Sequence, residues 1–315
     1  MAKFAGGSTY NFGLGVSGQN NGFFIPEIYS KKVQIALRKA AVAEAVCNTD
    51  YMGEISSFGD TVNIIKEPQI SVADYTRGLA VTSTDLTDQE LVLTVDQAKS
   101  FSFKIDDLEK RFSHVNFQAI AADNAAYALR DAMDSNILAA INAGATVTTG
   151  MGTTSTPIDI GFGSGEVDPL NQMALAAKEL DEANAPEDGR WFVAAPEWYN
   201  ALSNSSSKLL SVDFNAGQGS IRNGLVASGL LRGFSMYKSN NLPTNDLSGA
   251  TPAGSATAPV ALFGHMSSTA AASSMNKVET VRDTGTFSDI VRGLMVWGRK
   301  VLRPEVAGKI IYVID

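Results

Sequence analysis

The chain has 315 residues, of which 44% are hydrophobic and 18% charged, and its formal net charge is −8. This length suggests about two domains, and the composition is typical of a folded protein rather than a disordered one. The negative charge argues against a protein that wraps nucleic acid by neutralising phosphates, so we expect only nonspecific contact with DNA.

The scarcity of cysteine and histidine argues against disulfide-bonded and metal-binding proteins. Cys47 is the only cysteine, and His114 and His265 are the only histidines. An intrachain disulfide is therefore excluded, and zinc or haem would find almost no ligands. The sequence contains no apolar stretch of transmembrane length and no signal-peptide pattern at its start. We expect synthesis in the cytosol, no membrane partner and no bound metal.

Residues 13–18 read GLGVSG, which has the spacing of a dinucleotide-binding loop. That loop needs a buried strand before it and a helix that starts at its third glycine. Here Phe4, Tyr10 and Phe12 are scattered among Gly, Ser and Asn rather than forming an apolar strand, and Pro26 follows before a full helix could form. We therefore interpret residues 1–27 as a flexible glycine-rich arm and expect no cofactor.

Residues 28–46 place apolar side chains at helical spacing with basic side chains between them. The pattern predicts an amphipathic helix that lies on the domain's own core or on another subunit. Its apolar positions are Val33, Leu37, Ala40 and Ala41, and its basic positions are Lys31, Lys32, Arg38 and Lys39.

The period then changes from helical to alternating. Apolar residues alternate with polar ones around residues 62–64, 91–95 and 101–105, which predicts strands with one buried face. Residues 66–90 between the first two strands are long and polar, with Pro68 and Gly78. Because a two-stranded excursion of this kind is marginal alone, we expect it to lean on a neighbouring subunit.

Residues 106–143 carry the strongest helical pattern. Asp106 and Asp107 suit its start and Gly144 its end, and at about 1.5 Å per residue it would be about 55 Å long. We expect a structural spine. Its apolar stripe comprises Phe112, Val115, Ala119, Ala122, Ala126, Leu129, Met133, Ile137 and Ile141.

A mixed pattern of helices and strands follows. The glycine-rich segment 161–166 is interpreted as a turn rather than a phosphate-binding nest. Asp168 and Pro169 predict the start of a helix, because Asp is a favoured N-cap and Pro a favoured first helical residue. A buried strand is expected at residues 190–194, a helix from Pro196 and another strand around residues 234–237.

The C-terminal third combines small residues with alternating strands. We expect residues 203–224 to be mobile, residues 244–259 to form a surface insertion and residues 269–274 to form a short helix of small residues. Alternating strands are predicted in residues 276–283, 289–304 and 309–314.

This order of parts resembles the major capsid proteins of tailed double-stranded DNA bacteriophages, whose fold is shared by lambdoid phages, herpesviruses and encapsulins. Seven stretches in the same order carry the resemblance: FIPEIYSKKVQIALRKA, GDTVNI, VADYTRG, TVDQAKSFSFKIDDLE, LDEANAPEDGRWFVAAPEWY, GFSMYKSNNLP and VWGRKVLRPE.

The resemblance implies an α+β fold with six regions. These are an N-terminal arm (1–27), an amphipathic helix (28–49), an extended β-hairpin loop (50–104), a peripheral domain with the spine helix (105–149), an axial domain (150–276) and strands that return to the peripheral sheet (277–315).

The family also implies a structural protein without enzymatic activity. Hexamers and pentamers would close into an icosahedral shell around double-stranded DNA, assembled in the host bacterial cytoplasm, with a portal protein and possible decoration protein as partners. Some relatives carry a cleaved N-terminal scaffolding segment for which this chain has no room, so a separate scaffolding protein is expected. The lysine–asparagine pair that forms a cross-link in some relatives cannot be matched residue by residue to this sequence, so no cross-link is predicted. Subunit contacts are expected from Phe12, Phe23, Phe24, Lys66, Tyr75 and Arg77.

Two other hypotheses remain at this point. A bacterial nanocompartment shell, similar to encapsulins, would share the fold but enclose enzyme cargo. An enzyme would bind a nicotinamide nucleotide at residues 13–18, in a segment that lacks the frame such a loop requires.

Overall fold

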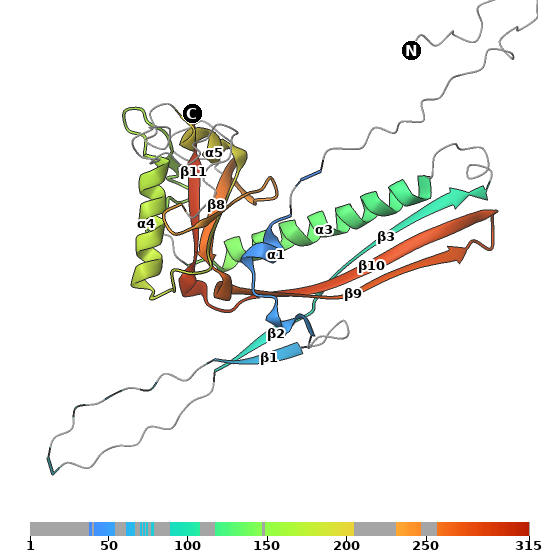
Figure 1. Ribbon diagram of the computed structural model, residues 1–315, viewed down its shortest axis with the longest axis horizontal. Coiled ribbons are helices and arrows are strands. Elements are labelled where there is room, and N and C mark those ends of the chain that lie inside the picture. The colour runs from blue at the N-terminus through green and yellow to red at the C-terminus, as the bar shows by residue number, and fades with distance from the viewer. Residues whose placement is uncertain are drawn as a thin grey trace, which may run out of the picture.

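The computed structural model describes residues 38–39, 41–53, 61–66, 70, 72, 74, 77–78, 89–107, 117–146, 149–204, 231–246 and 257–314. Within these, the fold is α+β (Figure 1). A long helix and a three-stranded sheet form an elongated region that extends from an α/β region with a larger sheet. The predicted arm and residues 205–224 of the predicted mobile stretch lie outside the described residues.

The elongated region is an antiparallel sheet with one helix along its face. The sheet order is β3-β10-β9, and α3 packs along β10 and β3 (Figure 1). Alternation explains this arrangement, because one face of β3 and β10 carries the apolar side chains that meet the helix. The bounds are Gln97–Asp106 for β3, Phe117–Gly144 for α3, Thr269–Arg282 for β9 and Ser288–Val301 for β10.

The α/β region is built on a mixed sheet of order β4-β11-β8-β5-β6, with β7 also paired to β8. Asp168 caps α4 as predicted, since its Oδ1 accepts a hydrogen bond from the Leu170 backbone N at 2.8 Å. The bounds are Ile158–Asp159 (β4), Pro169–Glu182 (α4), Arg190–Ala194 (β5), Pro196–Leu202 (α5), Ser235–Lys238 (β6), Thr244–Asp246 (β7), Thr257–His265 (β8) and Ala307–Val313 (β11).

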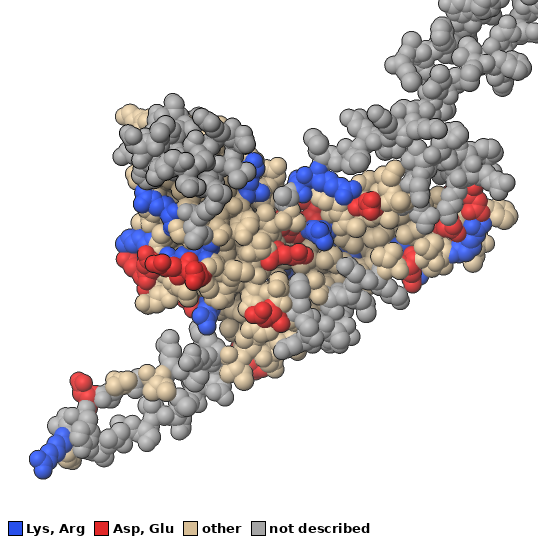
Figure 2. All heavy atoms as spheres, viewed as in Figure 1, with Lys and Arg blue, Asp and Glu red and all other residues tan. Residues whose placement is uncertain are grey.

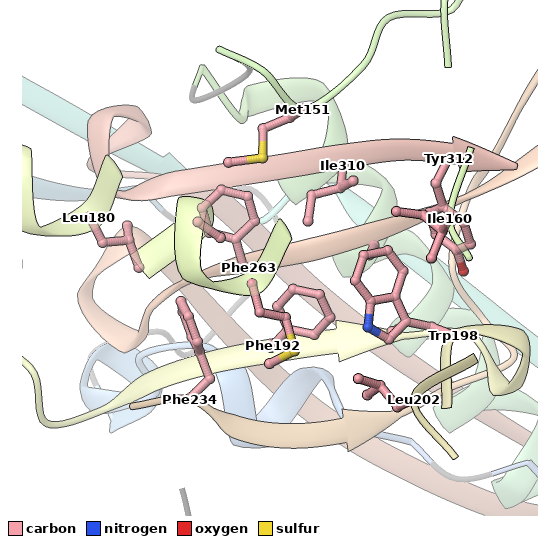
Figure 3. Packing of buried hydrophobic residues seen from close by; sticks show 14 of the residues in the cluster. Met151, Ile160, Leu180, Phe192, Trp198, Leu202, Phe234, Phe263, Ile310 and Tyr312 are labelled. Carbon is pink, nitrogen blue, oxygen red and sulfur yellow. The ribbon is translucent and has the colours of Figure 1, made fainter. Parts of the chain in front are cut away.

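Aromatic side chains fill the core between this sheet and helices α4 and α5 (Figure 3). Trp198 lies with its ring centroid 4.9 Å from that of Tyr312 and 5.4 Å from that of Phe192, in tilted and edge-on arrangements that aromatic rings favour. Burial raises the pKa of the Tyr312 and Tyr199 hydroxyls. The region therefore has a closely packed core of its own.

A second core joins the two regions. The C-terminal half of α3 buries Met133, Ile137 and Ile141 against strands of both sheets, as the predicted stripe requires. Ala119 and Ala126 of that stripe are exposed instead. The helical spine is thus anchored at its C-terminal end.

The predicted helix at residues 269–274 is wrong, because β9 begins at Thr269. Ala271 is buried in the core beside α3, while Ala270 and Ala272 are buried on the other face against Leu93 and Val296. Small side chains are required because both faces of the strand are covered. The alanines therefore reflect close packing and not helix propensity.

Two helix starts also differ from the prediction. Asp106 is the last residue of β3 rather than the first of the spine, because the ladder with β10 continues to the pair Asp106 and Ser288. Residues 108–116 are outside the described part of the chain. Of the helix predicted for residues 28–46, the described residues contain α1 (Ala43–Val46), whereas residues 38–39 and 41–42 are not helical; residues 28–37 and 40 lie outside the described part of the chain.

The prediction that all strands after residue 277 return to the spine sheet holds for β10 but not for β11. β11 pairs antiparallel with β8 and parallel with β4, inside the α/β sheet. The proposed boundary at residues 276/277 also falls inside β9. The chain crosses from one region to the other after Val301, through the short helical turn η5 (Pro304–Val306).

Candidate subunit interface

A hairpin of β1 (Thr61–Lys66) and β2 (Gln89–Thr94) projects away from both regions (Figure 1). Its inner face follows the predicted alternation: Val62, Ile64 and Leu91 are partly buried and Leu93 is fully buried. They pack beside Tyr51 of the short helical turn η2 (Asp50–Gly53) and a cluster that includes Val95 and Val296. The base of the hairpin is therefore held by its own subunit.

Apolar side chains on and beyond the hairpin have no such cover. Ile65 is 76% exposed, Ile70 73% and Val72 96%. Single exposed aliphatics are normal on a protein surface, but three in one projecting segment indicate a surface that another molecule covers. The signal was present in the sequence: Ile70 and Val72 alternate with polar residues inside a stretch that otherwise looks polar.

Two of the predicted contact residues lie in this segment. Lys66 is the last residue of β1, opposite Gln89, and Arg77 lies in an exposed turn with Gly78, whose φ of 91° favours glycine. Phe12, Phe23, Phe24 and Tyr75 lie outside the described residues. Lys66 therefore lies at the end of a strand, whereas Arg77 lies in a turn between the two strands.

Another exposed apolar residue, Phe287, lies at the far end of the three-stranded sheet. Its side chain is 81% exposed, and the turn that carries it is held by hydrogen bonds. The Asp107 backbone N donates to the Phe287 carbonyl at 3.0 Å, the Gly285 N donates to Asp283 Oδ1 at 3.0 Å, and the Thr286 hydroxyl donates to Asp283 Oδ2 at 2.6 Å. Sequence analysis did not single out this aromatic residue.

Charged side chains brace the same end of the sheet. Arg282 forms ion pairs with Asp107 and Asp289, and Lys104 with Asp283. Hydrogen bonds from Lys104 and Thr286 hold the pKa of Asp283 well below its usual range, and the bonds to Asp107 and Asp289 raise the pKa of Arg282. These groups are exposed or only partly buried, so their ion pairs orient the turn more than they stabilise the fold.

Three features of the described residues bear on metal binding, membrane insertion and nucleic-acid binding. No three His, Cys, Asp or Glu side chains gather in this part of the chain where they could hold a metal ion. Of the helices described, none has the length and apolar character needed to cross a bilayer. On the face shown in Figure 2, basic side chains lie beside acidic ones rather than forming one basic surface. The glycine loop at residues 13–18 is outside the described residues.

Comparison with protein families matches residues 89–310 to the family described as phage capsid protein. The chain belongs to the phage capsid protein family. This match covers most of the chain, including the long helix, both sheets and β2 of the hairpin. A search of curated proteins found no match to this chain.

Solved structures show the same fold. A chain from Mycobacterium phage Che8 is 28% identical with a TM-score of 0.72, and the match covers 94% of the capsid protein and 98% of that chain. The capsid structure of cyanophage P-SCSP1u is 22% identical with a TM-score of 0.70, covering 93% and 94%. The mature capsid of bacteriophage PhiM1 is 16% identical with a TM-score of 0.67, covering 92% of each chain.

These findings confirm the predicted fold and the structural, capsid-forming role. They do not favour the nanocompartment hypothesis, because the structures reported above come from phages. Exposed apolar residues on the hairpin and at the sheet end are accordingly interpreted as surfaces through which copies of the capsid protein associate.

Proposed function

We propose that the protein assembles as hexamers and pentamers into a closed icosahedral shell around the double-stranded DNA of a tailed phage. The observation that carries this proposal is the exposure of Ile65, Ile70 and Val72 on a segment that projects from the subunit. A neighbouring copy would remove this apolar surface from water, at about 25 cal/mol for each Å² buried.

The proposed regions follow the family, with three adjustments from the strand pairing. The arm is residues 1–27 and the amphipathic segment 28–49. The extended loop, predicted as residues 50–104, is shortened to 50–96, because β3 (Gln97–Asp106) pairs with β10 in the three-stranded sheet. The peripheral domain combines residues 97–149 with β9 and β10, and the axial domain combines most of residues 150–268 with β11. Phe12, Phe23, Phe24, Lys66, Tyr75 and Arg77 are proposed as contacts between subunits.

The proposed partners are other copies of the chain, a separate scaffolding protein, a portal protein and a decoration protein on the outside. Contact with packaged DNA would be weak and nonspecific. The net charge of the chain is −8, whereas binding along the phosphate backbone requires a surface rich in Lys and Arg. Assembly would take place in the host bacterial cytoplasm. We propose no enzymatic activity and no cofactor.

The hairpin surface can be tested by substitution. We expect Ile65→Ser combined with Val72→Ser to abolish or strongly reduce shell formation while the subunit unfolds at the same denaturant concentration as the native protein. Thr61→Ser, at an exposed position of the same strand face, is the matched control. Sedimentation and electron microscopy would measure assembly.

Normal shells from the double variant would contradict the role of this surface. The role would also be contradicted if the double variant unfolded at a clearly lower denaturant concentration than the native protein, because the side chains would then stabilise the subunit itself.

A further inference from the structure

The segment that leads into α1 is held on α3 by hydrogen bonds to its backbone. The Lys39 N donates to the Tyr127 hydroxyl at 2.7 Å, and the Val42 N and Ala43 N both donate to Asp134 Oδ1 at 2.7 Å. Residues 38–39 and 41–43, named here the anchor segment, are therefore positioned through main-chain groups. Ala43 is the first residue of α1, and residues 38–39, 41 and 42 before it are not helical.

The acceptors on α3 form a single stripe. Asn124, Tyr127, Asp131 and Asp134 follow one another at steps of three, four and three residues, which places them on one helix face. We name these four residues the polar ladder. Arg38 reaches its first two members: its Nη2 lies 3.2 Å from Asn124 Oδ1, and its guanidinium carbon lies 5.3 Å from the centre of the Tyr127 ring.

Asp134 also connects the ladder to the α/β region. Its Oδ2 accepts a hydrogen bond from Asn241 Nδ2 at 2.9 Å, and the same amide donates to Asp131 Oδ1 at 2.6 Å. Asp134 is 2% exposed and Asn241 6% exposed. A buried carboxylate is costly unless its oxygens are hydrogen-bonded, and here both oxygens receive donors from other segments.

Burial changes sharply along the anchor segment. Val42 and Ala43 are buried in the core beside Met133, whereas Arg38, Lys39 and Ala41 are exposed. Residues 38–39 are thus held mainly by polar contacts, which contribute little net free energy in water. That part of the segment can detach from α3 while α1 stays in place.

We propose that the polar ladder is a docking track for the anchor segment, with Asp134 as its positioning residue. The track fixes the position of Arg38 and Lys39 on α3, and through Asn241 it couples this position to the loop after β6. Detachment of residues 38–39 leaves the remaining fold intact. This part of the proposal concerns the unassembled subunit and does not depend on shell formation.

Trypsin reports on this segment directly, because it cleaves after Arg38 and Lys39. We expect Tyr127→Phe, which removes one acceptor and keeps the ring, to raise the cleavage rate at these sites about five- to tenfold, since one net hydrogen bond is lost. Cleavage after Arg77, in the exposed turn of the hairpin, is the internal reference and should not change. Asp123→Asn, at an exposed position of α3 outside the ladder, is the matched control.

Hydrogen exchange separates the positioning role of Asp134 from a general structural one. Asp134→Asn should accelerate exchange of the Val42 and Ala43 amides and of residues 239–242 together, whereas Tyr127→Phe should leave residues 239–242 unchanged. Equal cleavage after Lys39 in Tyr127→Phe and native protein would overturn the docking track. Uniform acceleration across the chain in Asp134→Asn, with no preference for these two segments, would overturn the positioning role.

One consequence rests on the proposed function. If the track sets the starting point of the residues before Arg38, Tyr127→Phe should broaden the distribution of particle diameters in electron micrographs. An unchanged distribution alongside faster cleavage would contradict only this consequence, and an absence of any particles from the native protein would contradict the proposed function instead.

Discussion

Burial of Cys47 lowers the chemical reactivity of its thiol. Its side chain is 1% exposed, and burial, with a smaller contribution from the negative charge of Asp134, raises the pKa of the thiol to about 12. The thiolate is the reactive form, so at pH 8 its fraction falls about a thousandfold relative to a thiol of ordinary pKa. We expect iodoacetamide to leave Cys47 unmodified in the folded protein and to modify it readily in guanidinium, as measured by mass spectrometry.

The same shift has a consequence for stability. Because the folded pKa is raised, the stabilisation is complete below the ordinary thiol pKa of 9.0 and is lost as pH rises towards 12. The free energy of unfolding should therefore fall less between pH 8 and pH 10 in Cys47→Ala than in the native protein. Rapid alkylation of the folded chain at pH 8 would contradict both expectations.

Gly308 is required by a close approach between strands. It lies opposite Phe263 in the ladder of β11 and β8, and a Cβ at this position would come within 2.1 Å of the Phe263 ring. Phe263 is fully buried and packed edge-on against Phe234, so it has no free space to move into. We expect Gly308→Ala to lower the free energy of unfolding by about 1–3 kcal/mol in urea titrations.

Gly285→Ala is the control for this substitution. Gly285 lies in an exposed turn, and the nearest atom to an added Cβ would be Asp283 Oδ1 at 3.8 Å. The control should unfold at nearly the native urea concentration. Equal effects of the two substitutions would show that the contact with Phe263 is unimportant.

At the scale of elements, the turn between β9 and β10 presents Phe287 on a rigid support. We expect Phe287→Ser to leave the unfolding of the subunit unchanged, because the side chain is 81% exposed, and to weaken assembly, because the hydrogen-bonded turn holds an aromatic side chain ready for a partner. Light scattering during assembly would measure the effect. Unchanged assembly would exclude this turn from the contacts between subunits.

The strands were predictable wherever one face of a strand is covered and the other is not. Phe101 and Phe103 in β3 alternate with exposed Ser102 and Lys104, and sequence alternation identified them. The Ala270–Ala272 segment was misread because both of its faces are buried, which removes the alternation and selects small residues that also favour helices. The periodicity of the local sequence therefore could not predict that both faces of this strand are buried.

Long-range partners escaped sequence analysis for a related reason. The position of the anchor segment depends on Tyr127 and Asp134, which lie about 90 positions away from the residues they hold. The pairing of β11 with β8 likewise depends on the topology of the whole sheet and not on the alternation within residues 307–313. The candidate contact residues named from the sequence included Lys66 and Arg77 but not the exposed aliphatics Ile70 and Val72.

At the scale of the whole molecule, the two regions differ in how completely they are packed. Helices α4 and α5 cover the α/β region and give it an aromatic core of its own. The elongated region has a helix on one face of its sheet, and the β1–β2 hairpin projects beyond it (Figure 1). Such a shape places the proposed contact surfaces far from the subunit's own core, as expected for a subunit whose exposed apolar residues are covered by neighbouring copies.

Cryo-electron microscopy of the particles formed when the chain is produced with and without the proposed scaffolding protein tests the central claim most directly. The account predicts closed shells of repeated subunits in hexamers and pentamers, with the β1–β2 hairpin lying against a neighbouring subunit. A protein that stays monomeric at high concentration, with and without the scaffolding protein, would contradict it.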